Sequence, residues 1–197
     1  MGEMIRMVVV LTVLSVVSGG GLAWIKGFAG PKIENQEMNL VKGPAIREML
    51  KASEKDPVEN RFKIQDGDTE RTIFVGVFGG KPDTVVLEAA GNGYGGKVGL
   101  AVAINTTTDT VYGISVTTHQ ETPGFGSKAK DDPSFGAQFA GKPVSMDFQV
   151  SQDGGSINAI GGATVTSKAV CVGVNSAVSA YRKLKPQLTE QTQSMGN

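Results

Sequence analysis

An uncharged run near the amino terminus constrains this chain more than any other feature. Nineteen residues, MVVVLTVLSVVSGGGLAWI, separate Arg6 from Lys26. An α-helix rises about 1.5 Å per residue, so a run of this length is roughly enough to cross the ~30 Å hydrocarbon layer of a membrane. Trp24, near one end, is a residue type that favours the membrane interface. We therefore predict a transmembrane anchor over residues 1–26.

A cleaved signal peptide is the alternative interpretation of the same run. Only residues 7–17 are strongly apolar, and small residues follow them. The glycines at 19–21 weaken a helix in water but are tolerated in lipid, where they also permit close helix packing. The flanking charges do not set an orientation, because Arg6 lies on one side of the run and Lys26 and Lys32 lie on the other.

Composition excludes several classes of function. The 197 residues carry a formal net charge of zero, so there is no basic surplus to attract nucleic acid. The single cysteine, Cys171, excludes an internal disulfide and a multi-cysteine metal site, and we interpret it as a small buried thiol. The single histidine, His119, leaves little room for a His-based metal centre or catalytic triad. We expect it to form hydrogen bonds within a loop.

The chain after the anchor is predicted to form a stalk (27–43), a folded domain (44–188) and a polar, frayed tail (189–197). In the domain, segments rich in β-branched and aromatic residues alternate with turns rich in Gly, Pro, Thr and Asp. This pattern predicts strands that pair consecutively and antiparallel. The predicted strands are residues 61–65, 71–78, 83–90, 97–105 and 110–118.

Helical signals flank these strands. Pro44 suits the first position of a short helix, and apolar residues within 46–50 have the spacing of one helical face. The final helix has the clearest signal, because apolar residues from 170 to 184 recur along one face. Pro186 is predicted to end it.

Three shorter elements complete the prediction. A short helix is expected over 133–140, and two more strands over 144–150 and 156–160. The order of elements predicts an α+β fold, a twisted antiparallel sheet with packed helices, preceded by one N-terminal transmembrane helix.

The stretch GGATVTS, residues 161–167, places three hydroxyls directly after a Gly-Gly pair. As ordinary structure it is a strand-to-helix connection, in which the glycines supply unusual backbone angles and Thr166 or Ser167 caps the helix. As a functional site it is a helix start whose unpaired N–H groups and dipole attract an anion. A hydroxyl at that position is suited to hold a phosphate or to be esterified to one. Spacing alone leaves both interpretations open.

Two more glycine-containing segments precede this stretch: GNGYGGKVGLAVAIN (91–105) and TTHQETPGFGSKAKD (117–131). As ordinary structure they contain a glycine turn and a Pro-Gly turn that places Phe125 in the core. As a ligand site, Tyr94 would stack on a ring, Phe125 would contact it and Thr122 would form a hydrogen bond. Glu121 would either orient Thr122 or be solvated.

The three segments together resemble the FMN-binding domains of two related membrane complexes. GGAT resembles the Ser/Thr-Gly-Ala-Thr flavinylation motif, GNG resembles that family's Gly-Asn-Gly segment, and ETPGFG resembles its Glu-Thr-Pro-Gly-hydrophobic-Gly loop. The two complexes are the Rnf electron-transport complex, through its G subunit, and the sodium-translocating NADH:quinone reductase, through its C subunit. The resemblance covers nearly the whole chain, and the compact length favours the G subunit of the Rnf complex.

The resemblance implies that Thr164 carries FMN through a phosphodiester bond, with Thr166 as the second candidate. Two positions differ from the family motif: Gly161 replaces Ser or Thr, and Asn158 replaces an Asp. If the transferase that attaches FMN reads those positions, attachment is expected to be slow or partial. The other implied FMN contacts are Gly162, Ala163, Val165, Thr166, Glu121, Thr122, Phe125 and Tyr94.

The resemblance also implies a function. The chain would be an electron-carrying redox subunit of a membrane-bound, ion-translocating oxidoreductase of the ferredoxin:NAD type, without complete activity alone. Its partners would be the other subunits of that complex, the flavin transferase and the cell membrane, with the domain on the extracytoplasmic side of a single span. Two other interpretations remain open: a membrane-tethered binding module without a redox role, and a noncovalent flavin binder.

Overall fold

The computed structural model describes residues 2–195, and the chain divides into two compact units, residues 1–40 and 41–197. The first unit contains helix α1 (Gly2–Glu37), which is followed by the π-helical turn η1 (Met38–Lys42). The part of α1 from Gly2 to Gly27 is long and apolar enough to cross a membrane, and none of its apolar window is buried. It is therefore the candidate membrane span. The predicted stalk, residues 27–43, is helical throughout.

The second unit is built on a five-stranded antiparallel sheet with the strand order β1-β2-β3-β4-β5. Short turns explain why neighbours in sequence are neighbours in the sheet. For example, Gly79 and Gly80, which join β2 to β3, have φ values of 57° and 71°, as a two-residue hairpin turn of type I′ requires. The predicted strands and their antiparallel order are confirmed. The observed strands are β1 (Arg61–Asp66), β2 (Thr69–Phe78), β3 (Lys81–Asn92), β4 (Lys97–Asn105) and β5 (Thr110–Thr118).

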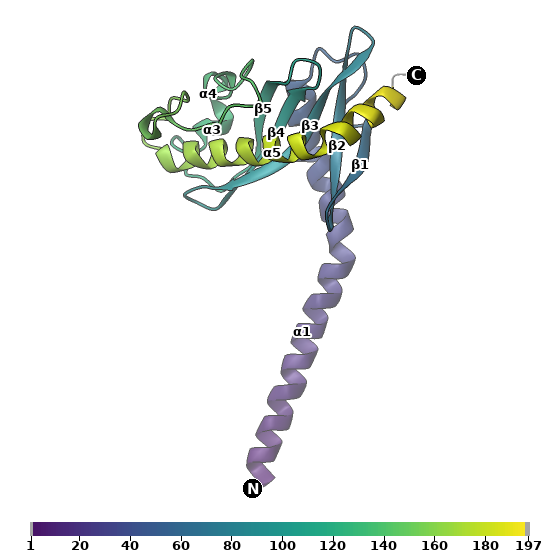
Figure 1. Cartoon of the computed structure of the whole chain (residues 1–197). Helices are drawn as coiled ribbons and strands as arrows, with labels where there is room; N and C mark the ends of the chain where they lie inside the picture. The colour runs from purple at the N-terminus through teal and green to yellow at the C-terminus, as the bar shows by residue number, and fades with distance from the viewer. Residues whose placement is uncertain (1, 196–197) are drawn as a thin grey trace. The chain divides into compact units, whose positions relative to one another are not determined.

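The long helix α5 (Thr164–Met195) crosses one face of the sheet and packs on β3 and β4 (Figure 1). Glycine lets the helix and the sheet approach closely, because a Cβ atom on Gly91 of β3 would lie 1.9 Å from the carbonyl oxygen of Ala169. Core side chains from the sheet, among them Leu87 and Val102, are buried together with Tyr181 of α5. The predicted α+β fold is thereby confirmed.

The short helix α2 (Gly43–Met49) covers the opposite face of the sheet. Gly113 of β5 faces Met49 of α2 and pairs with Ala103 of β4. Val102, the residue before Ala103, is buried in the core cluster with residues of α5. Because neighbouring residues of a strand face opposite sides of the sheet, α2 and α5 lie on opposite faces. Ile46 of α2 is fully buried, as its predicted place on the apolar face requires. Helices therefore pack on both faces of the sheet, the long α5 on one face and the short α2 against β4 and β5 on the other.

The prediction that Pro186 ends the last helix is wrong, because α5 continues through it to Met195. Proline removes one backbone N–H and crowds the carbonyl four residues earlier, which costs stability inside a helix. Burial beyond the proline offsets this cost, since Leu188 is fully buried and Thr192 is 3% exposed. Residues 189–195, predicted to fray, therefore belong to the helix.

The predicted strands at 144–150 and 156–160 are also wrong. The apolar alternation is real, since Phe148 and Ile157 are buried, but the two segments share only one isolated bridge, Val150 with Ile157. Some of their backbone groups are bonded by side chains instead. Asn175 of α5 accepts from the N–H of Phe148 and donates to its C=O, both at 2.9 Å, and Arg182 donates to the C=O of Val144.

Short helices occupy the region before these segments. The helix predicted over 133–140 is present as α4 (Pro133–Ala137), and α3 (Lys128–Asp131) precedes it. Asp132 caps α4 by accepting a 2.9 Å hydrogen bond from the N–H of Ser134. A single 3₁₀ turn, η2 (Ser151–Asp153), lies between the two segments that were predicted as strands.

Candidate functional site

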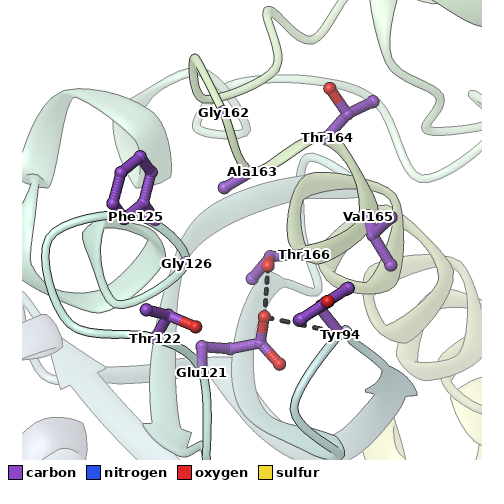
Figure 2. Close-up of a pocket in the computed structure, with 10 residues that line it drawn as sticks. All are labelled: Tyr94, Glu121, Thr122, Phe125, Gly126, Gly162, Ala163, Thr164, Val165 and Thr166. Atoms are coloured by element: carbon purple, nitrogen blue, oxygen red, sulfur yellow. Dashed lines mark hydrogen bonds between the residues drawn. The ribbon is translucent and has the colours of Figure 1, made fainter.

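The three glycine-containing segments meet at one open cavity of about 450 Å³ beside the first turn of α5, which we call the three-loop cavity (Figure 2). All nine residues predicted to contact FMN line it, together with Gly126. They come from the β3–β4 turn, the loop after β5 and the start of α5. Their contact with FMN stays a prediction, but their proximity is a property of the fold.

The Gly-Gly pair forms a tight turn in front of α5. The N–H of Ala163 donates to the C=O of Ile160 at 2.9 Å, and Gly162 has a φ of 77°. A positive φ at the third position of such a turn is typical of type II and favours glycine. A Cβ atom on Gly162 would also lie 3.0 Å from the ring of Phe125, whereas a Cβ atom on Gly161 would meet nothing within 4 Å.

The two glycines should therefore respond differently to the same substitution. Gly162→Ala is expected to lower the free energy of unfolding by about 1–2 kcal/mol, through positive-φ strain and contact with Phe125. Gly161→Ala is expected to be neutral or to stabilise by up to about 1 kcal/mol. Urea unfolding of the two purified variants measures the difference. Equal destabilisation by both changes would contradict the type II turn.

The two hydroxyls after Thr164 do not cap α5 as predicted. Ser167 is buried, accepts from the N–H of Ile160 at 2.9 Å and donates to the C=O of Ala163 at 3.0 Å, so it holds the turn against the helix. Thr166 donates to the carboxylate of Glu121. Within residues 2–195, no hydrogen bond reaches the N–H groups of residues 164–166. The first turn of α5 is therefore open to an anion.

Glu121 is 5% exposed, and its carboxylate accepts hydrogen bonds from three groups. The N–H groups of Gly95 and Tyr94 donate at 2.8 and 3.3 Å, and the hydroxyl of Thr166 is the third donor. Burial raises the pKa of this carboxyl, but the hydrogen bonds outweigh burial and hold the pKa below its ordinary value. The predicted solvation of Glu121 is therefore wrong, and within residues 2–195 no hydrogen bond joins its carboxylate to Thr122.

The rim of the three-loop cavity carries exposed aromatic rings. Tyr94 is 80% exposed and Phe125 is 56% exposed, so Phe125 does not lie in the core as the ordinary structural interpretation would require. Figure 2 shows the hydroxyl of Thr166 directed at Glu121, whereas Thr164 points away from that carboxylate. Thr164 is partly exposed and Thr166 is 1% exposed. Of these two threonines, only Thr164 is accessible to solvent to an appreciable extent.

Two residues singled out by their rarity have ordinary roles. His119 accepts a hydrogen bond from the N–H of Glu121 at 3.3 Å, as expected of a loop residue. Cys171 is 3% exposed, and burial raises the pKa of its thiol to about 11. In the part of the chain that the structure describes, no group of three or more His, Cys, Asp or Glu side chains is placed to hold a metal ion.

Sequence reasoning missed two residues of this region. A Cβ atom on Gly126 would lie 2.7 Å from Glu121 Oε2 and 2.8 Å from Thr166 Oγ1, so this glycine makes room for that pair. The sequence signal that could have identified Gly126 was its position as the last residue of the ETPGFG stretch. Gln138 bonds both backbone groups of Asn158, accepting from the N–H at 2.7 Å and donating to the C=O at 3.2 Å. No local pattern indicates this pairing across 20 positions.

Two solved structures share this fold. The crystal structure of the C subunit of the Na⁺-translocating NADH-quinone reductase from Parabacteroides distasonis has a TM-score of 0.61 and 21% identity, covering 78% of this chain and 94% of that chain. Shewanella oneidensis NqrC has a TM-score of 0.53 and 21% identity, covering 71% and 73%. At this identity the likeness shows the fold alone.

The family model of the FMN-binding domain matches residues 93–179, the part of the chain that contains every residue lining the three-loop cavity. The chain belongs to the G-subunit family of ion-translocating oxidoreductase complexes, which confirms the predicted family. The G subunit from Vibrio cholerae is 30% identical over 193 residues, 92% of each chain. The protein of that name from Methanosarcina acetivorans is 30% identical over 178 residues, 89% of this chain and 93% of its own.

Proposed function

We propose that this chain is an electron-carrying subunit of an ion-translocating oxidoreductase complex and that Thr164 holds its FMN through a phosphodiester bond. When bound, FMN supplies the redox chemistry, and the chain supplies binding, orientation and electrostatics. The observation that carries the proposal is the position of Thr164, a partly exposed hydroxyl on the first turn of α5 that lines the three-loop cavity.

The residues of the cavity suit FMN. A volume of about 450 Å³ lies in the usual range for cofactor sites. The open N–H groups of residues 164–166 and the helix dipole favour an anionic phosphodiester at this helix start. The rings of Tyr94 and Phe125 at the rim offer apolar surface to a flat aromatic ligand.

The geometry favours Thr164 over Thr166 as the acceptor. Thr166 is almost fully buried, and its hydroxyl already donates to Glu121. Esterification of Thr166 would remove that donor and place a phosphodiester charge against a buried carboxylate. Thr164 makes no such contact among the described residues, so its modification leaves the hydrogen bonds of the cavity wall intact.

The attachment step needs an activated flavin. A bond forms between the Thr164 hydroxyl oxygen and the phosphorus of FMN, and a phosphoanhydride bond of the donor nucleotide breaks. With a flavin dinucleotide as the donor, the leaving group would be its nucleoside monophosphate, which would take up the hydroxyl proton, so no electrons change hands. A flavin transferase is the proposed partner for this step, and the protein gains the mass of FMN less one water.

A covalent link suits the exposed site. Retention of FMN no longer depends on affinity, so the open cavity can leave one edge of the ring system accessible for electron transfer. We further propose that α1 spans the cell membrane with the amino terminus inside, and that the domain lies on the extracytoplasmic side, where lost cofactor could not be replaced from the cytoplasm. The other subunits of the complex would then donate and accept the electrons.

The test is mass spectrometry and in-gel fluorescence of the denatured full-length chain after co-expression with a flavin transferase. The wild type should stay fluorescent and gain the mass of FMN less one water. Thr164→Val should lose the label completely, and Thr164→Ser should keep it because the hydroxyl remains. A wild type that denatures without colour would eliminate covalent attachment. Retention of the label by Thr164→Val together with its loss in Thr166→Val would move the acceptor to Thr166.

A further inference from the structure

One buried carboxylate joins all three loops of the three-loop cavity. Glu121 lies in the loop after β5, and it is bonded to Gly95 and Tyr94 of the β3–β4 turn and to Thr166 of α5. These partners lie 26, 27 and 45 positions away in the chain. In the described part of the chain, no other side chain is hydrogen-bonded to both the β3–β4 turn and α5. Glu121 therefore links the three walls of the cavity through hydrogen bonds.

Glycines from two loops enclose this carboxylate. A Cβ atom on Gly93 would lie 2.5 Å from Glu121 Oε1, and one on Gly126 would lie 2.7 Å from Glu121 Oε2. Both distances are shorter than any ordinary contact of a Cβ atom. The glycines of GNGYGG and ETPGFG at these two positions therefore both leave room for the side chain of Glu121.

The same carboxylate places a charge at the cavity. Glu121 lines the three-loop cavity, and within residues 2–195 no Lys or Arg forms an ion pair with it. Its three partners are neutral donors, which stabilise an ionised carboxylate without cancelling its charge. A fixed negative charge beside a ligand opposes the addition of further negative charge to that ligand.

We propose that Glu121 is the positioning residue that assembles the three-loop cavity, and that its charge lowers the reduction potential of the FMN bound there. The first part concerns the chain alone. The second part rests on the proposed function, because it needs FMN in this cavity. Glu121 acts through the backbone of the β3–β4 turn and through Thr166, and not as an acceptor of electrons or protons.

The variant Glu121→Gln tests both parts, since it keeps the shape of the side chain and removes the charge. In the flavin-free full-length chain, the N–H groups of Tyr94 and Gly95 should exchange with deuterium about tenfold faster, because the one amide oxygen of Gln is a weaker, neutral acceptor and its amide nitrogen accepts no hydrogen bond. In the FMN-loaded chain, the reduction potential should move to a more positive value. The control is Glu48→Gln, a carboxylate whose side chain is 78% exposed and which should change neither measurement.

A second pair of variants separates positioning from general damage. Thr166→Ser keeps the donor to Glu121 and should retain wild-type exchange, whereas Thr166→Val should accelerate exchange in the β3–β4 turn. Unchanged exchange in Glu121→Gln would overturn the positioning role. Faster exchange with an unchanged potential would overturn the role of the charge. A wild type that carries no FMN would refute the proposed function, while the exchange measurement would still decide the positioning role.

Discussion

Replacing Gly91 by alanine is expected to lower the free energy of unfolding by about 3 kcal/mol. The added Cβ atom would lie 1.9 Å from the carbonyl oxygen of Ala169 and 3.0 Å from its Cα atom, both of which belong to the backbone of α5. A backbone cannot rotate away as a side chain can, so the helix must shift from the sheet along its closest approach. Urea unfolding followed by circular dichroism measures the loss.

Gly173 of α5 is the matched comparison for Gly91. A Cβ atom there would lie 2.2 Å from Leu100 Cδ1, which is the end of a flexible side chain, and 3.3 Å from a backbone carbon of Ala90. Alanine also favours a helix over glycine by about 1 kcal/mol, which offsets part of the crowding. Gly173→Ala should therefore destabilise much less than Gly91→Ala. The reverse order would contradict the packing of α5 on β3.

Leu188→Ala is expected to lower the free energy of unfolding by about 2–4 kcal/mol. Leu188 lies beyond Pro186 and is fully buried in the core cluster, so truncation leaves a cavity between α5 and the sheet. The effect measures directly whether the helix continues through the proline. Thermal or urea unfolding of the full-length chain provides the value.

The control for Leu188 is an apolar residue on the exposed side of the same helix. Val172 is 58% exposed, and Val172→Ala should change stability by no more than about 0.5 kcal/mol. If Leu188→Ala were as mild as Val172→Ala, the end of α5 would be frayed, as the proline alone suggests.

The strands were predictable because their information is local. Alternating apolar residues and two-residue turns such as Gly79-Gly80 fix both the strands and their pairing. The segments 144–150 and 156–160 have a similar alternation but no strand beside them. Their partners include side chains such as Asn175, 27 positions from Phe148, and no short window of sequence contains both groups. Similarly, Pro186 is a local signal to stop a helix, and the burial of Leu188 that overrides it is a tertiary effect.

Only part of the candidate site could likewise be predicted from the sequence. The nine residues that the motif resemblance selected all line one cavity, and the three loops that supply them carry recognisable glycine patterns. The motif resemblance did not predict the hydrogen bonds that these residues form. The ordinary structural interpretation predicts that Thr166 or Ser167 caps α5, yet Thr166 bonds to Glu121 and Ser167 closes the Gly-Gly turn. These roles depend on distances between loops that are far apart in the chain.

The solitary thiol has a practical consequence. Because Cys171 is buried and its pKa is raised to about 11, it carries almost no thiolate at neutral pH. A cysteine introduced at an exposed position, for example in place of Ser156, would therefore be the dominant target of a maleimide dye or spin label. The native chain is thus ready for single-site labelling, and probes attached in this way would report distances to neighbouring subunits without prior removal of the natural cysteine.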